Sequence, residues 1–399
     1  MQKLGTVHAN PNFPVTRDSA IHFIVTLGTI SLLADVTYEG ARSINGPFLG
    51  ALGASAAVVG IVSGAGELIG YVLRLAGGIA ADKTRRYWTL TVVGYVINLL
   101  VVPFMALANH WGIAAALIIA ERAGKGLRTP ARDVMLSQAS KIVGRGWGFG
   151  LHEFMDQTGA FLGPLLVALV VKETGHYTRA YALLGIPAGL AIVALVRAIK
   201  LYPDPSRFEE TTTPEMQAVG LPRTFWIYLA GSGLIAAGFV DLPLIAFHFQ
   251  KTNLVSPASI PVLYAIAMGV EGLTALLAGK LFDRMGTPVL IAGVLLAAAS
   301  NPLVFFGSFY AAVAGMALWG AGMGALQSTM RARISDLVPT ERRGAAYGIF
   351  NTAYGVLWFA GSSMVGILYG WSLAAAVAFA MAAQLAAIPL LLISRRRAA

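Results

Sequence analysis

Long apolar runs separated by short polar or charged segments dominate this sequence of 399 residues. A bilayer core of about 30 Å needs about 20 apolar residues in helical form, so runs of this length predict membrane-spanning helices. Twelve segments can be placed, at about residues 19–42, 54–80, 88–108, 111–137, 145–171, 178–200, 223–249, 258–282, 288–307, 309–333, 343–369 and 372–393. The pattern predicts an all-α membrane protein with twelve transmembrane helices.

Two sequence landmarks occur twice along the chain. The charged exit Gly78-Ile-Ala-Ala-Asp82-Lys83-Thr84-Arg85-Arg86 returns in a shorter form as Gly279-Lys-Leu-Phe-Asp283-Arg284. An arginine-glycine step with an aromatic-glycine pair just after it occurs at 145–150 and again at 343–348. The nearly constant offset predicts two pseudo-symmetric six-helix bundles, residues 1–200 and 223–399, joined by a flexible polar linker at 201–222.

Composition supports a membrane location and limits the partners. The chain is 57% hydrophobic and 12% charged, with a mean hydropathy of +0.70, which excludes an ordinary water-soluble domain. The net charge of +10 is spread between apolar runs, so we interpret it as an orienting charge and expect no nucleic acid partner. The absence of cysteine excludes disulfides and thiolate metal sites.

The basic residues also predict how the chain crosses the membrane. If the N-terminus lies in the cytoplasm, the segments on the outer side hold only Arg42, Lys172, Arg179 and Lys251, and most other basic residues lie inside. By the positive-inside rule, both termini are therefore expected in the cytoplasm.

Ionisable residues within the predicted helices are candidates for function, because burying charge in a bilayer is costly. They are Asp35 and Glu39 in the first helix, Glu67 in the second, Glu121, Arg122 and Lys125 in the fourth, His152, Glu153 and Asp156 in the fifth, and Asp241 and Glu271 in the seventh and eighth. We interpret these residues as sites for proton coupling or substrate, with Glu67 and Glu271 also suited to hydrogen bonds between helices.

Spacing predicts which of these side chains meet. Asp35 and Glu39 share a helix face, and crowded carboxylates in a low dielectric can exchange a proton. Glu39 could instead pair with Arg42 and anchor the outer end of the helix. Glu121 and Lys125 are expected to pair, which leaves Arg122 to hold an anionic substrate or to join a structural ion-pair network.

His152 and Asp156 also share a helix face and could form a proton relay. They could alternatively supply two ligands of a metal site, but no further ligands accompany them, and we expect no metal and no cofactor. The polar residues thus concentrate in the first half of the chain. The second half offers an aromatic wall that includes Tyr354 and Trp358, suited to an amphiphilic substrate.

A conformational latch is predicted from residues at the cytoplasmic helix ends: Gly78, Asp82, Arg85, Arg132, Arg145, Asp283 and Arg284. Glycines 77 and 78 are expected to let the second and eleventh helices approach closely. Asp82 is expected to pair with Arg132 or Arg145 only when the inner gate is closed.

These residues carry a resemblance to the major facilitator superfamily that covers essentially the whole chain. Gly78-x-x-x-Asp82-Lys83-x-Arg85-Arg86 resembles the family's signature loop, with Thr84 where glycine is usual. Arg122-x-x-x-Gly126 is similar to the fourth-helix motif of proton-coupled members, with Lys125 where glutamine is common. Gly159-x-x-x-Gly163-Pro164 resembles the fifth-helix motif of exporters, although Val167 and Ala168 replace its trailing glycine pair.

The resemblance implies a monomeric transporter in the cytoplasmic membrane of a prokaryote. Leu33-Ala-Asp35-Val-Thr37-Tyr-Glu39 is similar to a prokaryotic branch of drug and proton antiporters. The leading hypothesis is proton-coupled export of a small organic molecule by alternating access. Proton-coupled uptake of an organic anion is the alternative, followed by metal or lipid transport. No nucleotide-binding or nucleophile motif is present, so neither ATP use nor enzyme activity is expected.

Overall fold

The computed structural model describes residues 16–203, 220–339 and 342–395, and for Arg145, Gly146, Arg343, Gly344 and Ala345 it describes the backbone only. The described part is helical and contains no strand. Most of the predicted linker, residues 204–219, lies outside the described residues. The helices are α1 (Arg17–Ala51), α2 (Ala56–Thr84), α3 (Tyr87–Phe104), α4 (Trp111–Val143), α5 (Arg145–Thr174), α6 (Tyr177–Leu183), α7 (Gly185–Leu201), α8 (Arg223–Gly238), α9 (Leu242–Lys251), α10 (Ser259–Met285), α11 (Thr287–Phe306), α12 (Phe309–Leu337), α13 (Arg343–Trp371) and α14 (Leu373–Arg395).

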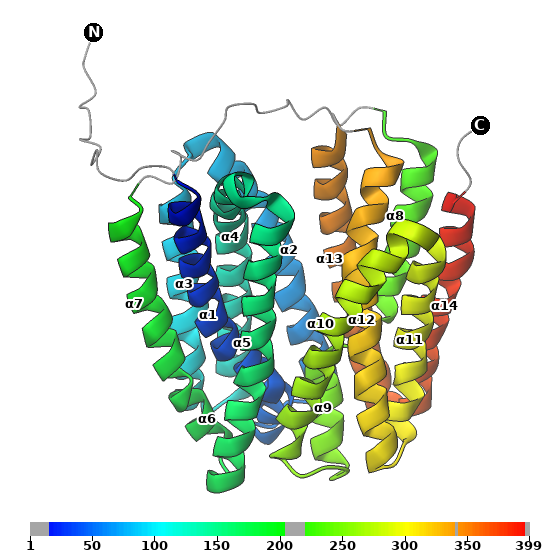
Figure 1. Cartoon of the computed structure of the whole chain (residues 1–399). Helices are drawn as coiled ribbons and strands as arrows, with labels where there is room; N and C mark the ends of the chain where they lie inside the picture. Colours follow the sequence, from blue (N-terminus) through cyan, green and yellow to red (C-terminus); the bar gives the residue numbers. More distant parts are fainter. Residues whose placement is uncertain (1–15, 204–219, 340–341, 396–399) are drawn as a thin grey trace.

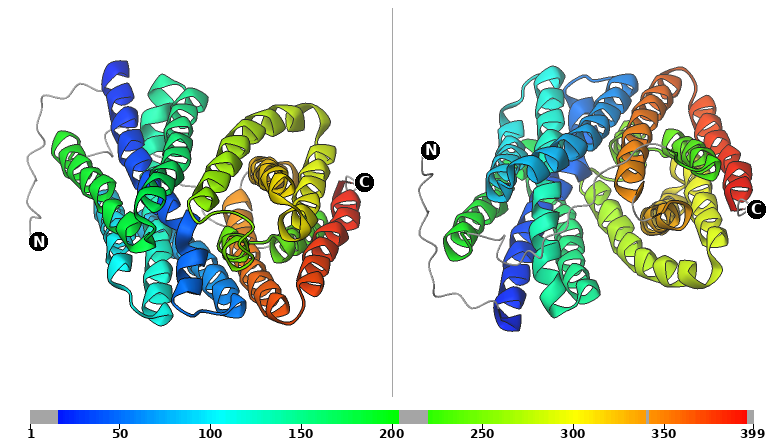
Figure 2. Two further views of the ribbon diagram at one scale, coloured as in Figure 1. Left: turned by 90° about the horizontal axis from the view of Figure 1, so that it is seen from below. Right: turned by 90° about the horizontal axis from the view of Figure 1, so that it is seen from above.

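The helices form two halves that lie side by side, α1–α7 in one and α8–α14 in the other (Figure 1). The start of α1, the end of α14 and the ends of α7 and α8 that flank the linker lie at the same end of the molecule, which we call the termini end. Figure 2 looks along the helices and shows α2 of the first half beside α13 of the second. Each half thus faces the other across one long interface.

Eleven helical stretches are long and apolar enough to cross a membrane, in the part of the chain that the structure describes. They include α6 with α7, and α8 with α9, as single spans interrupted once. The remaining long helix, α4, is not among these eleven apolar stretches, because it carries several charges, including Glu121, Arg122 and Lys125. These charges face protein rather than lipid, because Glu121 and Arg122 are both buried.

The predicted end of the first helix is wrong. Its outer limit was expected near residue 42, but α1 continues to Ala51 and is 35 residues long. Arg42 therefore lies inside the protein, and the prediction that it sits at the outer surface is also wrong. The sequence Asn45-Gly46-Pro47 reads as a turn, but here it remains helical because it packs against α9 of the other half.

The seventh predicted helix, expected to be continuous over 223–249, is broken at Phe239–Asp241. Pro243 lies in the first turn of α9, where its missing N–H leaves no helical hydrogen bond unmade. Trp319 of α12 donates its indole N–H to the carbonyl oxygen of Val240 at 2.9 Å. A side chain from another helix thus satisfies a backbone group that the break releases.

Glycines set how closely the two halves approach. A Cβ placed on Gly60 of α2 would collide with the carbonyl oxygen of Ser362 on α13, and one on Gly46 would collide with that of Pro243. The expectation that Gly77 and Gly78 perform this role is wrong. They face α4, where the nearest atoms to the added Cβ are Leu127 O at 3.0 Å and Pro130 Cβ at 3.8 Å.

We predict that Gly46→Ala destabilises the described arrangement by about 1–3 kcal/mol, because the added methyl group meets the backbone of Pro243. The apparent melting temperature in detergent should fall. Gly189→Ala is the matched control, since a Cβ there has no atom within 4 Å and alanine favours a helix interior. Equal melting temperatures for both variants would contradict the close contact.

Candidate functional site

A cavity of about 400 Å³ lies between the two halves. Its lining comes from α1, α2, α4 and α5 on one side and from α10, α12, α13 and the α8–α9 break on the other. It extends toward the termini end, where Leu136 near the end of α4 and Phe149 near the start of α5 line it. Toward the opposite end the halves touch, for example where Tyr177 donates to Gln250 at 3.2 Å.

Three cations and two carboxylates on the wall from the first half form one connected ion-pair network. Glu39 lies 3.5 Å from Lys125 Nζ and 3.9 Å from Arg42. Glu67 lies 3.3 Å from Arg42 and 3.7 Å from Arg122. The prediction that Glu67 pairs with other helices is confirmed, because α1, α2 and α4 all contribute to the network.

Glu121 completes the charge balance from behind the cavity wall. Its carboxylate lies 3.2 Å from Arg122 Nε and accepts a hydrogen bond from Asn98 Nδ2 at 2.7 Å. The predicted pair between Glu121 and Lys125 is wrong, since Lys125 reaches across to Glu39 on α1. A cation in a low dielectric pairs with whichever carboxylate tertiary packing brings nearest, and same-helix spacing does not decide this.

Asp35 differs from every other acid in this wall. It is 6% exposed and lines the cavity, but it makes no ion pair among the described residues, and its Oδ1 has no hydrogen-bond donor there. Its Cβ packs against Gly159 of α5, where an added Cβ would lie 2.8 Å away. An unpaired carboxyl group at this depth is stable only when a proton or a ligand compensates it.

The fifth helix forms a second polar cluster. Asp156 lies 3.6 Å from His152 Nδ1 and 3.5 Å from Arg132, which confirms that His152 and Asp156 share a face. Ser31 lies 3.1 Å from His152 Nε2 and accepts a hydrogen bond from Arg132 at 3.0 Å. Across the described residues, no group of three His, Cys, Asp or Glu side chains is placed to hold a metal ion.

Two further acids in the cavity bind neutral amides. Gln157 donates to Glu153 at 3.1 Å, and Gln327 donates to Glu271 at 3.2 Å. The prediction that Glu271 makes a hydrogen bond between helices is confirmed, because Gln327 lies on α12. These carboxyl groups have no cationic partner within the described ranges, so they could also accept protons or a ligand.

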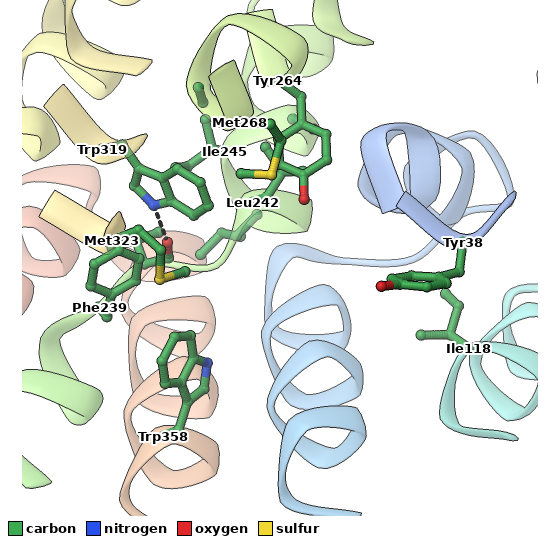
Figure 3. Packing of buried hydrophobic residues seen from close by; sticks show 14 of the residues in the cluster. Tyr38, Ile118, Phe239, Leu242, Ile245, Tyr264, Met268, Trp319, Met323 and Trp358 are labelled. Carbon is green, nitrogen blue, oxygen red and sulfur yellow. Dashed lines mark hydrogen bonds between the residues drawn. The ribbon is translucent and has the colours of Figure 1, made fainter. Parts of the chain in front are cut away.

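The wall from the second half is aromatic. Phe239, Tyr264, Trp319 and Trp358 gather there, and Figure 3 shows them on the opposite side from Tyr38 of α1. Trp358 was predicted, but Phe239, Tyr264 and Trp319 were missed, because helical spacing alone does not separate cavity aromatics from packed ones.

Asp241 lies behind this wall. It does not line the cavity, and it accepts hydrogen bonds from Trp358 Nε1 at 2.8 Å and from the Ser362 hydroxyl. The position of Asp241 in the α8–α9 break allows its side chain to hold the indole ring of Trp358 in place.

One hydrogen bond joins the two walls directly. Tyr264 of α10 donates its hydroxyl to Glu39 of α1, on the oxygen that also faces Arg42. Sequence spacing gave no signal for this contact, because its partners are 225 positions apart. The ion-pair network therefore includes a residue from the second half.

The predicted latch pair between Asp82 and Arg132 is not formed among the described side chains in this conformation. Asp82, Arg85, Asp283 and Arg284 are exposed, and no ion pair joins them to another described residue. Arg132 is engaged with Asp133 and Asp156 instead of Asp82. The side chain of Arg145 lies outside the described side chains. A cavity that reaches the termini end agrees with an unlatched state, but the latch roles stay predictions.

The sequence profile of the Major Facilitator Superfamily matches residues 27–362 and 229–399. The chain belongs to this superfamily. It is 39% identical over 378 residues to an uncharacterised protein of Mycobacterium tuberculosis, covering 93% of this chain and 92% of the relative. It is 25% identical over 381 residues to an uncharacterised MFS-type transporter of Methanocaldococcus jannaschii, covering 93% and 94% of the two chains.

Solved structures show the same fold. The nucleoside transporter NupG superposes with a TM-score of 0.77 at 14% identity, covering 94% of this chain and 100% of that one. An inward-facing bacterial homologue of the lysosomal transporter Spinster gives a TM-score of 0.69 at 14% identity, covering 94% and 95%. The predicted fold class is therefore confirmed: this is a transporter of the superfamily, with eleven apolar spans and the more charged helix α4 arranged in two halves.

We predict that Glu39→Gln lowers stability by about 3 kcal/mol, because it leaves Lys125 in the protein interior without a carboxylate. The double variant Glu39→Gln/Lys125→Met should be more stable than Glu39→Gln alone, since the uncompensated ammonium group is gone. Melting temperatures in detergent measure both effects. The exposed Glu173→Gln serves as the control and should leave the melting temperature unchanged.

Proposed function

We propose that this transporter is driven by protons and exports a small, amphiphilic organic molecule by alternating access. The unpaired carboxyl group of Asp35 is the observation that carries the proposal. It lies in the cavity that substrate must cross, and it lacks the cation that neutralises Glu39 and Glu67. A proton can therefore compensate Asp35 where a salt bridge compensates the others.

The two walls of the cavity differ in chemistry. The wall from the first half supplies charged groups, and the wall from the second half supplies Phe239, Trp319, Tyr354 and Trp358. A molecule with a polar group and a flat apolar part would satisfy both walls at once, as small-molecule sites commonly do. This complementarity supports an amphiphilic substrate.

We place the termini end in the cytoplasm, with the chain in the inner membrane of a prokaryote. Lys83 in the last turn of α2 and Arg85 and Arg86 between α2 and α3 lie at that end, whereas Lys172, Arg179 and Lys251 lie in the helices that meet at the opposite end. The positive-inside rule favours this orientation. The cavity described here then faces the cytoplasm, and export begins from this state. We propose that the chain acts as a monomer without a cofactor.

Uptake of an organic anion with Arg122 as its clamp is the alternative for this cavity. Arg122 lies 3.2 Å from Glu121 and 3.7 Å from Glu67, so an anion would have to displace one of these carboxylates. This engagement favours a structural role for Arg122. Metal transport and catalysis have less support, since no described group of three ligand side chains could hold a metal, and the hydroxyl beside His152, that of Ser31, is fully buried and does not line the cavity. Lipid transport has no observation of its own in this cavity.

We predict that Asp35→Asn abolishes transport driven by a pH gradient while the protein stays folded. Proteoliposomes loaded with a pH-sensitive dye and screened against drugs, organic anions and sugars measure proton movement upon substrate addition. Asp336→Asn, at an exposed position outside the cavity, is the control. Unchanged proton coupling in Asp35→Asn would remove Asp35 from the mechanism, and substrate uptake in the direction of proton entry would reverse the proposed direction.

We predict that Asp82→Asn slows the transport cycle several-fold, because the variant removes a charge from the proposed gate. Substrate affinity should not change, because Asp82 is exposed and does not line the cavity. Equilibrium binding and flux, measured on the same preparation, separate the two effects. A large loss of affinity would contradict a role in the gate.

A further inference from the structure

The cations that line the cavity differ in whether a carboxylate pairs with them. Four of them, Arg42, Arg122, Lys125 and Arg132, form ion pairs with carboxylates at 2.8–3.9 Å. Arg128, 1% exposed, instead lies with its guanidinium 4.1 Å from the centre of the Tyr95 ring.

Arg74 and Arg331 also line the cavity, yet neither forms an ion pair with any described residue. Arg128 also lacks a carboxylate partner among the described residues, but it is buried against Tyr95. Arg74 is partly exposed and Arg331 is exposed, so these two arginines are the positive charges that a ligand in the cavity can reach.

Arg74 is held by aromatic rings on the α2–α13 side of the cavity. Its guanidinium carbon lies 5.4 Å from the centre of the Tyr71 ring, and Tyr71 packs edge-on against Tyr354 with ring centres 5.8 Å apart. Arg74 Nε is buried and has no hydrogen-bond partner in the described part of the chain. A buried donor without an acceptor is unfavourable unless a ligand supplies one.

Arg331 lines the same cavity from α12 of the other half. Its backbone carbonyl accepts a hydrogen bond from the Tyr347 hydroxyl at 3.0 Å. Gly348, next to Tyr347, faces Leu75, which directly follows Arg74 in α2. A Cβ added to Gly348 would lie 3.5 Å from Leu75 Cδ1. The first turns of α13 therefore contact both arginine-bearing segments, and the side chain of Arg331 is exposed into the cavity.

Asn351 adds an uncharged donor to the same cavity. It lies on α13, one helical turn after Tyr347 and one before Tyr354, and it lines the cavity. None of the hydrogen bonds among the described residues uses its amide group. The two guanidinium groups carry only donors, and the amide adds two more N–H donors beside its own carbonyl oxygen, so groups from three helices of one cavity can donate to an anion.

We propose that Arg74, Arg331 and Asn351 form a binding site for the anionic group of the transported molecule, a carboxylate, sulfonate or phosphate. The apolar part of this organic anion lies against Tyr354 and Trp358 of α13. Guanidinium groups bind such oxyanions through paired, charge-assisted hydrogen bonds. The inference rests on the proposed function, because it assumes that this cavity is the transport site.

The site also links binding to closure at the termini end. Arg74 moves with the first half and Arg331 with the second, so an approach of the halves there brings two positive charges together. Like charges oppose that approach in a low dielectric, and a bound anion removes the repulsion. An anionic substrate thus favours the closed state over the open one by binding it more tightly.

Binding of matched probes to the purified, full-length protein in neutral detergent tests this site. The probes are 2-naphthoate, 2-naphthalenesulfonate and 2-naphthyl phosphate, with neutral 2-naphthamide as the control ligand. Tryptophan fluorescence reports binding, because Trp319 and Trp358 line the cavity. We expect at least one anion to bind and the amide not to bind. Arg74→Gln and Arg331→Gln should each weaken anion binding about tenfold or more.

Arg197→Gln, at an exposed arginine outside the cavity, should bind the anions as the parent protein does. The proposal is overturned if no anion binds, if the amide binds equally well, or if both cavity variants keep full affinity. Repeating the titration in nanodiscs with and without phosphatidylglycerol separates two sources of the anionic group. Competition by that lipid alone, with no effect of the soluble anions, would assign the arginines to a lipid headgroup instead of a substrate.

These titrations use a fixed pH and no gradient, so they are independent of proton coupling. If anion binding fails while transport still depends on Asp35, only the anion site is wrong. If anions bind but a pH gradient drives no transport, the coupling proposal fails and the anion site remains.

Discussion

The cost of placing charge inside a membrane protein governs this structure. Arg42, Arg122 and Lys125 lie at membrane depth only because Glu39, Glu67 and Glu121 compensate them. The partners come from α1, α2 and α4, so the same contacts that neutralise charge also fix how these helices sit relative to one another. Removing any member leaves an opposite charge unmatched, which makes the network a structural unit as well as the wall of a cavity.

The proposed function rests on the exceptions to this balance. Asp35 has neither a cation nor a hydrogen-bond donor on its Oδ1, and the accessible Arg74 and Arg331 have no carboxylate partner among the described residues. Unmatched groups of both signs in one cavity can each be satisfied by something that arrives from solution, a proton for the acid and an anion for the arginines.

The sequence predicted the fold class and one of the two side-chain pairs expected from i, i+4 spacing, His152 with Asp156 but not Glu121 with Lys125. His152 meets Asp156 because four residues make about one turn of one helix. Contacts between helices were harder to predict. Lys125 pairs with Glu39 and not with Glu121, and Tyr264 donates a hydrogen bond to Glu39, which is 225 positions away in the sequence. Periodicity gives the direction in which a side chain leaves its own helix, but tertiary packing decides which neighbour stands there.

Local signals misled where the two halves meet. Asn45-Gly46-Pro47 has the composition of a turn, yet packing against α9 keeps it helical and carries Arg42 into the interior. Pro243, in contrast, acts as local chemistry predicts and marks a real interruption between α8 and α9. Proline thus lies in the first turn of a new helix in one half and within a continuous helix in the other, according to what surrounds it.

The hydroxyl of Tyr264 makes the electrostatics of the first half depend on the position of the second. Any rotation that parts the halves at the end opposite the termini must withdraw this donor from Glu39, while Lys125 and Arg42 stay behind. The carboxylate would then hold its two cations without competition from the tyrosine. The charge distribution around Glu39 consequently changes whenever the two halves move relative to each other.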